Sequence, residues 1–213
     1  MPRSDLAALL AGTAVVPVLV VDSVDTGVAL ARALVAGGLA MLEITLRTPT
    51  ALEVIRAIGH EIEDAVVGAG TVLDPQQYRA AEQAGARFVV SPGATASLLA
   101  HAEASATPFL PGAVTSSEVM SLLERGYSCL KFFPAEPAGG IAYLKALAAP
   151  LPAARFCPTG GIDVASAPRY LALPNVLCVG GSWVAPGEAV AAGDWPRITA
   201  LARAAAALGR APG

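Results

Sequence analysis

The chain has 213 residues, enough for one domain that buries roughly 70% of the surface its unfolded form exposes, and 54% of its residues are hydrophobic with a mean hydropathy of +0.58. A net charge of −3 and a pI near 5.4, with no basic cluster, argue against nucleic acid as a partner. No uninterrupted apolar run is long enough to span a bilayer, so we expect a mature cytoplasmic protein without a membrane partner.

Short runs rich in β-branched residues alternate with alanine- and leucine-rich stretches along the whole chain. This alternation predicts strands separated by helices. The expected strands are residues 15–21, 41–46, 65–70, 87–90, 108–110, 129–133, 155–157 and 176–179. A leading helix at residues 5–10 and a closing helix at residues 195–208 flank the series.

The ends of several helices can be recognised from short motifs. Asp74-Pro75 opens one helix, residues 115–118 (TSSE) resemble a capping box, and Gly85 and Gly126 close two others. Eight βα units predict a single (β/α)8 TIM barrel domain over residues 1–213 with an additional N-terminal helix and a loose tail at 209–213. A doubly wound open sheet is the alternative.

Charged side chains interrupt two of the expected strands. In CLKFFP, alternation places Lys131 and Phe133 on one face, and in LEITLRT it places Glu43, Thr45 and Arg47 on one face. The apolar residues between them suit the layer of helices. The charged side chains are therefore expected to point into the barrel and towards its mouth.

Glycine-rich turns follow several strands at the same end of the predicted barrel, where barrel enzymes carry their chemistry. These turns are GAGT (68–71), SPG (91–93), PGA (111–113), PTGGID (158–163) and GGSW (180–183). The turns after strands seven and eight offer backbone N–H groups that can bind a phosphate. Plain βα turns are the alternative for each of them.

A lysine inside a water-poor pocket can act as a nucleophile, because its neutral amine attacks a carbonyl to form a Schiff base. Lys131 is the candidate, and Glu43 is the expected general acid and base. Arg47 suits bidentate capture of a substrate carboxylate, and Phe133 could exclude water. The alternative is a buried ionic network in which Glu43 only compensates Lys131 or Arg47.

Metal chemistry is not expected from this sequence. Cys129, Cys157 and Cys178 lie in apolar stretches without paired spacing and read as small core residues in a reducing compartment. The only histidines, His60 and His101, lie in polar helical segments, which argues against a histidine metal cluster.

The motifs VPVLVV, LEITLRT, VGAGTVLDPQQ, SPG, KFFPAE, RFCPTGGID and VLCVGGSW occur in an order and spacing that resemble the bacterial 2-keto-3-deoxy-6-phosphogluconate (KDPG) aldolases. These enzymes share activity with 4-hydroxy-2-oxoglutarate aldolases. The resemblance covers almost the whole chain and implies a (β/α)8 barrel, usually a homotrimer. It implies a class I aldolase that needs no metal and no cofactor and acts on a small molecule, a 2-keto acid with a phosphorylated aldehyde as partner.

The resemblance also implies roles for individual residues. Lys131 of KFFPAE matches the Schiff-base lysine, and Glu43 of LEITLRT matches the residue that transfers protons. The implied substrate-binding residues are Arg47 for the pyruvate carboxylate, Thr71 and Pro92 near the pyruvyl group, Thr159, and for the phosphate Gly160, Gly161, Gly181 and Ser182.

Three other functions remain open at this point. The same mechanism could act on 4-hydroxy-2-oxoglutarate or on the galactonate epimer of KDPG, since the sequence does not report stereochemistry at C4. A sugar-phosphate isomerase or epimerase on the same barrel would use Glu43 as base and Lys131 only as a charge. A catalytically silent sugar-phosphate binder is the third.

Overall fold

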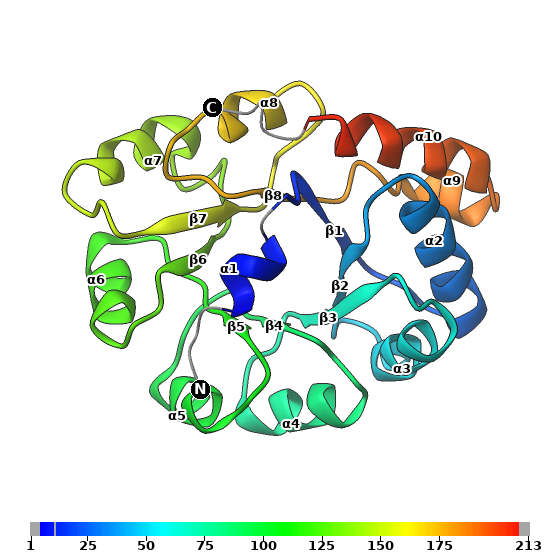
Figure 1. Cartoon of the computed structure of the whole chain (residues 1–213), viewed down its shortest axis with the longest axis horizontal. Coiled ribbons are helices and arrows are strands. Elements are labelled where there is room, and N and C mark those ends of the chain that lie inside the picture. The colour runs from blue at the N-terminus through cyan, green and yellow to red at the C-terminus, as the bar shows by residue number, and fades with distance from the viewer. Residues whose placement is uncertain (1–4, 11, 209–213) are drawn as a thin grey trace.

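Eight parallel strands and ten helices alternate over residues 5–10 and 12–208, which are the residues that the computed structural model describes (Figure 1). The strands are β1 (Val15–Leu19), β2 (Met41–Thr45), β3 (Val66–Gly70), β4 (Val89–Val90), β5 (Phe109–Leu110), β6 (Cys129–Phe132), β7 (Arg155–Pro158) and β8 (Val179–Gly181). The helices are α1 (Asp5–Leu10), α2 (Val24–Ala36), α3 (Ala51–Glu61), α4 (Pro75–Gln83), α5 (Ala96–Ala104), α6 (Ser116–Glu124), α7 (Gly140–Ala148), α8 (Ala167–Leu171), α9 (Gly187–Ala191) and α10 (Trp195–Ala206).

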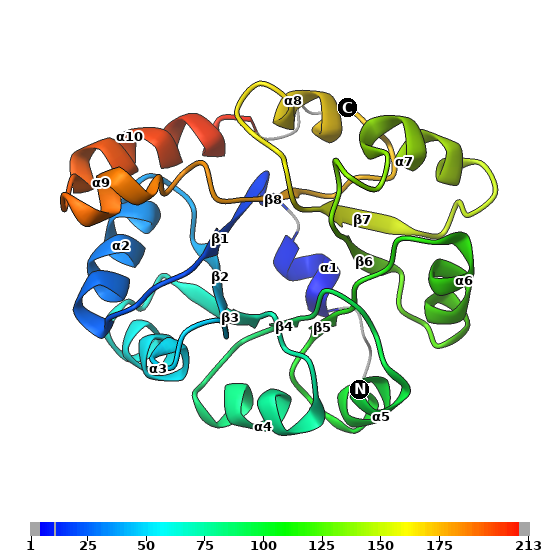
Figure 2. The ribbon, with the colours of Figure 1, turned by 180° about the vertical axis from the view of Figure 1, so that it is seen from behind.

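The strands close into a ring. One sheet has the order β5-β4-β3-β2-β1-β8, and β6 pairs with β7. Single bridges between Gly112 and Lys131, and between Thr159 and Gly180, join the two sheets on either side. Figures 1 and 2 show this ring from its two ends, with α1 over its centre and the other helices around it. The predicted (β/α)8 barrel is confirmed, rather than an open doubly wound sheet.

Alternate residues of the strands serve two different layers. Leu42 and Ile44 of β2, and Leu130 and Phe132 of β6, are fully buried in the cluster that packs the strands against the helices. Burial of each such side chain stabilises the fold by about 1.5–3 kcal/mol. The intervening residues therefore face the inside of the barrel, as the alternation predicts, and Lys131 is among them.

The amino-terminal end of the barrel is filled with apolar side chains. Leu6 and Leu10 of α1 pack in one cluster with inward-facing residues that include Met41, Cys157 and Cys178. The neighbouring Cys157 thiol, together with burial, holds the pKa of Cys178 well above its ordinary value. These thiols are core groups, as predicted from their apolar surroundings.

Helix ends match the motifs that predicted them. Asp74 caps α4 by accepting from the Gln77 N–H at 2.8 Å, and Thr115 and Glu118 form the expected capping box of α6. Gly85 and Gly126 follow α4 and α6 with positive φ. Across residues 5–10 and 12–208, no helix combines the length and apolarity that a membrane span needs.

The main differences from the predicted elements are at strand ends. The fifth strand begins at Phe109, because Pro108 has no N–H to donate to a ladder. The eighth strand was expected at residues 176–179 but is formed by 179–181, and Val176 makes only a single bridge to Phe156. The expected tail at 209–213 lies outside the described residues.

Candidate active site

A cavity of about 450 Å³ opens at the carboxyl ends of the strands. It brings together residues from the ends of β1, β2, β3, β4, β6, β7 and β8. All of the predicted site residues except Glu43 line it, namely Arg47, Thr71, Pro92, Lys131, Phe133, Thr159, Gly160, Gly161, Gly181 and Ser182. The polar strand ends seen in the sequence therefore converge on one pocket.

Lys131 and Glu43 form a buried ion pair between β6 and β2. The Lys131 Nζ donates to the Glu43 Oε1 at 2.9 Å, and the two side chains are 6% and 4% exposed. Glu43 does not line the cavity but contacts its floor through Lys131. A carboxylate in this place can accept a proton from the ammonium and return it, which is the exchange that an amine nucleophile needs.

The position of Glu43 is set by the close approach of β3. A Cβ atom at Gly70 would lie 2.2 Å from the Glu43 Oε1, so no larger residue fits there without moving the carboxylate. On the same strand as Glu43, the Thr45 hydroxyl donates to the carbonyl of Leu19 at 2.9 Å and ties β2 to β1.

Arg47 lies just beyond β2 and is oriented by Thr71. Its Nε donates to the Thr71 Oγ1 at 3.3 Å, and the guanidinium reaches the cavity. Thr71 itself has φ of 58°, a left-handed conformation that is unfavourable for a β-branched residue. Such strain is typical of functional sites, where the surrounding structure enforces it. A guanidinium held in this way can bind a carboxylate with two parallel hydrogen bonds.

The turn after β7 exposes backbone donors to the cavity. Gly160 and Gly161 have φ of 103° and 81°, which only glycine adopts readily. Within residues 12–208, no protein group accepts from either N–H. Ser182, just beyond β8, lines the same cavity with an exposed side chain. These donors suit an anion, but α8 begins only at Ala167, so the turn and not a helix N-terminus supplies them.

Phe133 covers the lysine from the cavity side. The Lys131 Nζ lies 5.5 Å from the centre of the Phe133 ring. The ring also lies against the 160–161 turn, since a Cβ at Gly160 would be 3.2 Å from it. Phe133 thus links the amine to the 160–161 turn and can restrict water between them.

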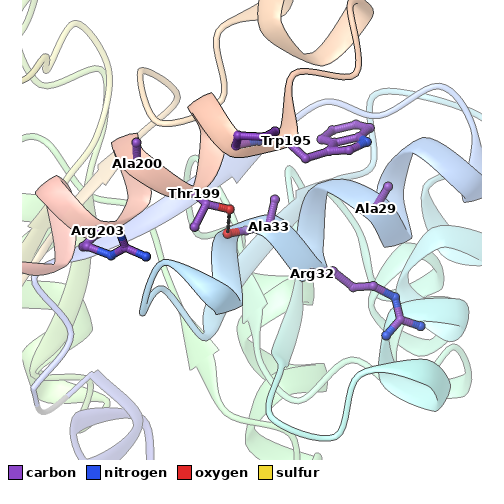
Figure 3. Close-up of a pocket in the computed structure, with 8 residues that line it drawn as sticks. Ala29, Arg32, Ala33, Trp195, Thr199, Ala200 and Arg203 are labelled. Atoms are coloured by element: carbon purple, nitrogen blue, oxygen red, sulfur yellow. Dashed lines mark hydrogen bonds between the residues drawn. The ribbon is translucent and has the colours of Figure 1, made fainter.

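A second groove, of about 610 Å³, lies outside the barrel between α2 and α10 (Figure 3). Two of its polar groups already have partners: Arg32 pairs with Glu61 at 3.0 Å, and the Thr199 hydroxyl donates to the carbonyl of Ala33 at 3.0 Å. The groove contains no lysine or carboxylate. None of the residues that the sequence predicts for the site lines this larger groove.

The two histidines lie away from the cavity. His101 on α5 contacts Glu82 at 3.4 Å, and His60 is in the last turn of α3. Within residues 5–10 and 12–208, no three His, Cys, Asp or Glu side chains are grouped in a way that could hold a metal ion.

The sequence reading missed apolar residues that shape the cavity. Val18 and Val20 of the first strand and its extension, with Ile162, line it beside the polar groups. The alternation in VPVLVV could have placed Val18 and Val20 on the inward face, because they are two residues apart.

The chain matches the family model described as KDPG and KHG aldolase over residues 6–201. It is 52% identical over 191 residues to the KHG/KDPG aldolase of Escherichia coli (strain K12), and the match covers 90% of both chains.

Solved structures agree with the sequence comparison. The crystal structure of the 2-keto-3-deoxy-6-phosphogluconate aldolase of Zymomonas mobilis ZM4 with 3-phosphoglycerate aligns with a TM-score of 0.94 at 48% identity, covering 99% of each chain. A KDPG aldolase from Legionella pneumophila, with pyruvate captured as a covalent carbinolamine intermediate, aligns with a TM-score of 0.92 at 43% identity, again over 99% of each chain.

Proposed function

Because the chain belongs to the KDPG and KHG aldolase family, we propose that it is a metal-independent class I aldolase that reversibly cleaves KDPG to pyruvate and D-glyceraldehyde 3-phosphate. The observation that carries this proposal is the buried contact of 2.9 Å between the Lys131 amine and the Glu43 carboxylate at the floor of a cavity. The relative that holds pyruvate as a covalent carbinolamine supports the same chemistry.

The reaction begins at Lys131. Glu43 accepts a proton from the ammonium, and the neutral amine attacks the C2 carbonyl of the keto acid to give a carbinolamine. Glu43, directly or through water, then donates the proton with which the hydroxyl leaves as water. The product is an iminium ion between Lys131 and the substrate, which withdraws electrons from the neighbouring carbon.

Bond cleavage uses the iminium as an electron sink. Loss of the proton from the C4 hydroxyl, to Glu43 or to a water that it holds, breaks the C3–C4 bond. The electron pair moves into the iminium to give an enamine, and the aldehyde leaves. Protonation of the enamine at the methyl carbon by the same carboxylate, followed by hydrolysis, releases pyruvate and restores Lys131.

The remaining residues bind the two ends of the substrate. Arg47 holds the keto-acid carboxylate, with Thr71 and Pro92 beside the pyruvyl group and Thr159 on the cavity wall. The phosphate is bound by the backbone donors of residues 160–161 and by the Ser182 hydroxyl, with Gly181 beside them on the cavity wall. This phosphate site favours KDPG over the unphosphorylated 4-hydroxy-2-oxoglutarate.

Three further statements belong to the same proposal. The protein is a homotrimer, as the family resemblance implies; it works in the cytoplasm; and the chain forms a single barrel domain. Sedimentation equilibrium would test the first of these.

The deciding experiment is trapping of the imine. The protein is incubated with pyruvate and sodium borohydride, and added mass is located by intact and peptide mass spectrometry. The chain has only two lysines, so Lys145 on α7 is an internal control. One reduced adduct on Lys131 supports the proposal; a folded sample with no adduct, or with its adduct on Lys145, refutes it.

A further inference from the structure

The loop that follows Lys131 is hydrogen-bonded to the turn after β7 that contains Gly160 and Gly161. The Ala135 N–H donates to the carbonyl of Thr159 at 2.8 Å, and the Glu136 N–H donates to the carbonyl of Gly160 at 3.1 Å. Both carbonyls are therefore turned towards the β6–α7 loop. The N–H groups of Gly160 and Gly161 have no protein acceptor in the described chain.

The Glu136 side chain is fixed in turn by a helix. The Tyr170 hydroxyl of α8 donates to the Glu136 Oε1, although Glu136 is exposed and Tyr170 is fully buried. Burial, followed by the hydrogen bond to this carboxylate, raises the pKa of Tyr170 well above its ordinary value, so the hydroxyl remains a donor.

The turn and the carboxylate side chain are in direct steric contact. A Cβ at Gly161 would lie 2.8 Å from both the Cβ and the Cγ of Glu136, and a Cβ at Gly140 would lie 2.9 Å from the Tyr170 hydroxyl. The turn therefore packs against the Cβ and Cγ atoms of Glu136, and its position depends on where those atoms are held.

We propose that Glu136 and Tyr170 are positioning residues that hold the 160–161 turn in the orientation that receives the phosphate of the substrate. The inference rests on the proposed function. A carboxylate next to an anion site opposes phosphate binding by its charge. Glu136 therefore contributes through the hydrogen bond that it accepts from Tyr170 and through the packing of its Cβ and Cγ against the turn. An uncharged side chain of the same shape with an acceptor oxygen should hold the turn equally well.

Three variants are expected to have different effects. Tyr170→Phe and Glu136→Ala remove the contact, and each should raise the KM for KDPG on the order of tenfold, the effect of losing a hydrogen bond to a charged group. Both should leave kcat, the KM for 4-hydroxy-2-oxoglutarate and pyruvate trapping on Lys131 near the wild-type values. Glu136→Gln keeps the acceptor oxygen without the charge and should bind KDPG as well as the wild type or better.

Competitive inhibition by inorganic phosphate gives an independent measure of the same site, and its inhibition constant should follow the KM for KDPG. The matched control is Tyr78→Phe. Tyr78 is also a fully buried tyrosine whose hydroxyl donates to a protein acceptor, the carbonyl of Thr107 at 2.8 Å, but it does not line the cavity. Its loss should change neither KM.

The result expected is a KM change confined to the phosphorylated substrate and restored in Glu136→Gln. Equal changes for both substrates, no change for either, or a Glu136→Gln enzyme as impaired as Glu136→Ala would overturn the inference. If thermal unfolding shows that Tyr170→Phe is not folded, the two Glu136 variants test the inference instead, because the Glu136 side chain is exposed and its replacement should leave the fold intact. A wild-type protein that traps no pyruvate overturns the proposed function and this inference together, whereas normal trapping without the substrate-specific change overturns the inference alone.

Discussion

Substituting Gly70 by alanine tests whether the place of the Glu43 carboxylate matters for the reaction. The added Cβ would lie 2.2 Å from the Glu43 Oε1 and 2.6 Å from its Cγ. Real Cβ atoms essentially never come within 3.0 Å of another atom, so the carboxylate oxygen must move by at least about 0.8 Å. The same oxygen accepts from Lys131 at 2.9 Å, and the movement disturbs that contact.

The magnitude follows from the cost of misplacing a catalytic group. A displacement of about 1 Å lowers the rate of an enzymatic step about 10²-fold, or about 2.7 kcal/mol in the barrier. We expect Gly70→Ala to reduce kcat for KDPG cleavage and the rate of pyruvate trapping on Lys131 by about this factor. Overpacking should also lower the free energy of unfolding by about 1–3 kcal/mol.

The assay is single-turnover trapping with pyruvate and borohydride, together with steady-state cleavage of KDPG. Gly59→Ala is the control, since its Cβ would have an ordinary contact of 3.8 Å with Val67 on the outside of the barrel. It should keep full activity and gain about 0.5–1 kcal/mol from the added helix preference. A Gly70→Ala enzyme that folds and traps pyruvate at the wild-type rate would refute the role given to the Glu43 carboxylate.

Three more outcomes are expected. Glu43→Gln should allow slow adduct formation but suppress exchange of the pyruvate methyl protons in deuterated water, followed by NMR; unchanged exchange would contradict proton transfer by Glu43. Ser182→Ala should raise the KM for KDPG far more than the KM for 4-hydroxy-2-oxoglutarate, and equal effects would argue against phosphate binding there. The hydrogen bond from the backbone N–H of Thr115 is the largest influence that holds the pKa of Glu118 below its ordinary value of 4.5. Glu118→Gln should therefore lose a stabilisation that is fully present above about pH 4.5 and that disappears as the pH falls through the lower pKa of the folded state. Urea unfolding at several pH values would show this, and a difference between the two proteins that grew on acidification would contradict it.

Alternation along the strands made the central pair predictable. Because side chains of a strand point to opposite faces, the apolar Leu130 and Phe132 fixed Lys131 as inward, and the same argument placed Glu43. That Lys131 lines a cavity and contacts Glu43 there is consistent with the parallel barrel, in which all strands end at the same face. The exact ends of strands were less predictable, since bridges such as the one between Thr159 and Gly180 depend on neighbours distant in the chain.

The contacts that adjust the site could not be predicted in this way. The Tyr170 hydroxyl reaches Glu136 across 34 positions of sequence, and Gly70 meets Glu43 only because two strands approach closely. The left-handed backbone of Thr71 has no sequence signal at all, because threonine disfavours it. Such features come from tertiary packing that overrides local preference.

If Lys131 and Glu43 were only a structural ion pair, a different effect of substitution on stability would be expected than if their role is catalytic. Removing two charges from water is unfavourable, and replacing a buried ion pair with apolar residues of similar size is often neutral or stabilising by about 1–4 kcal/mol. With side chains only 6% and 4% exposed, the pair belongs to this class. The double variant Lys131→Met, Glu43→Leu should therefore unfold at a urea concentration at least as high as the wild type does. Lys131→Met alone leaves a buried carboxylate unpaired, so its free energy of unfolding should fall by about 3–5 kcal/mol. If the double variant is instead much less stable than the wild type, the pair contributes to the fold and its presence is no argument for catalysis. If it is stable and traps no pyruvate, the fold does not require these charges, and their place in the barrel is explained by the reaction.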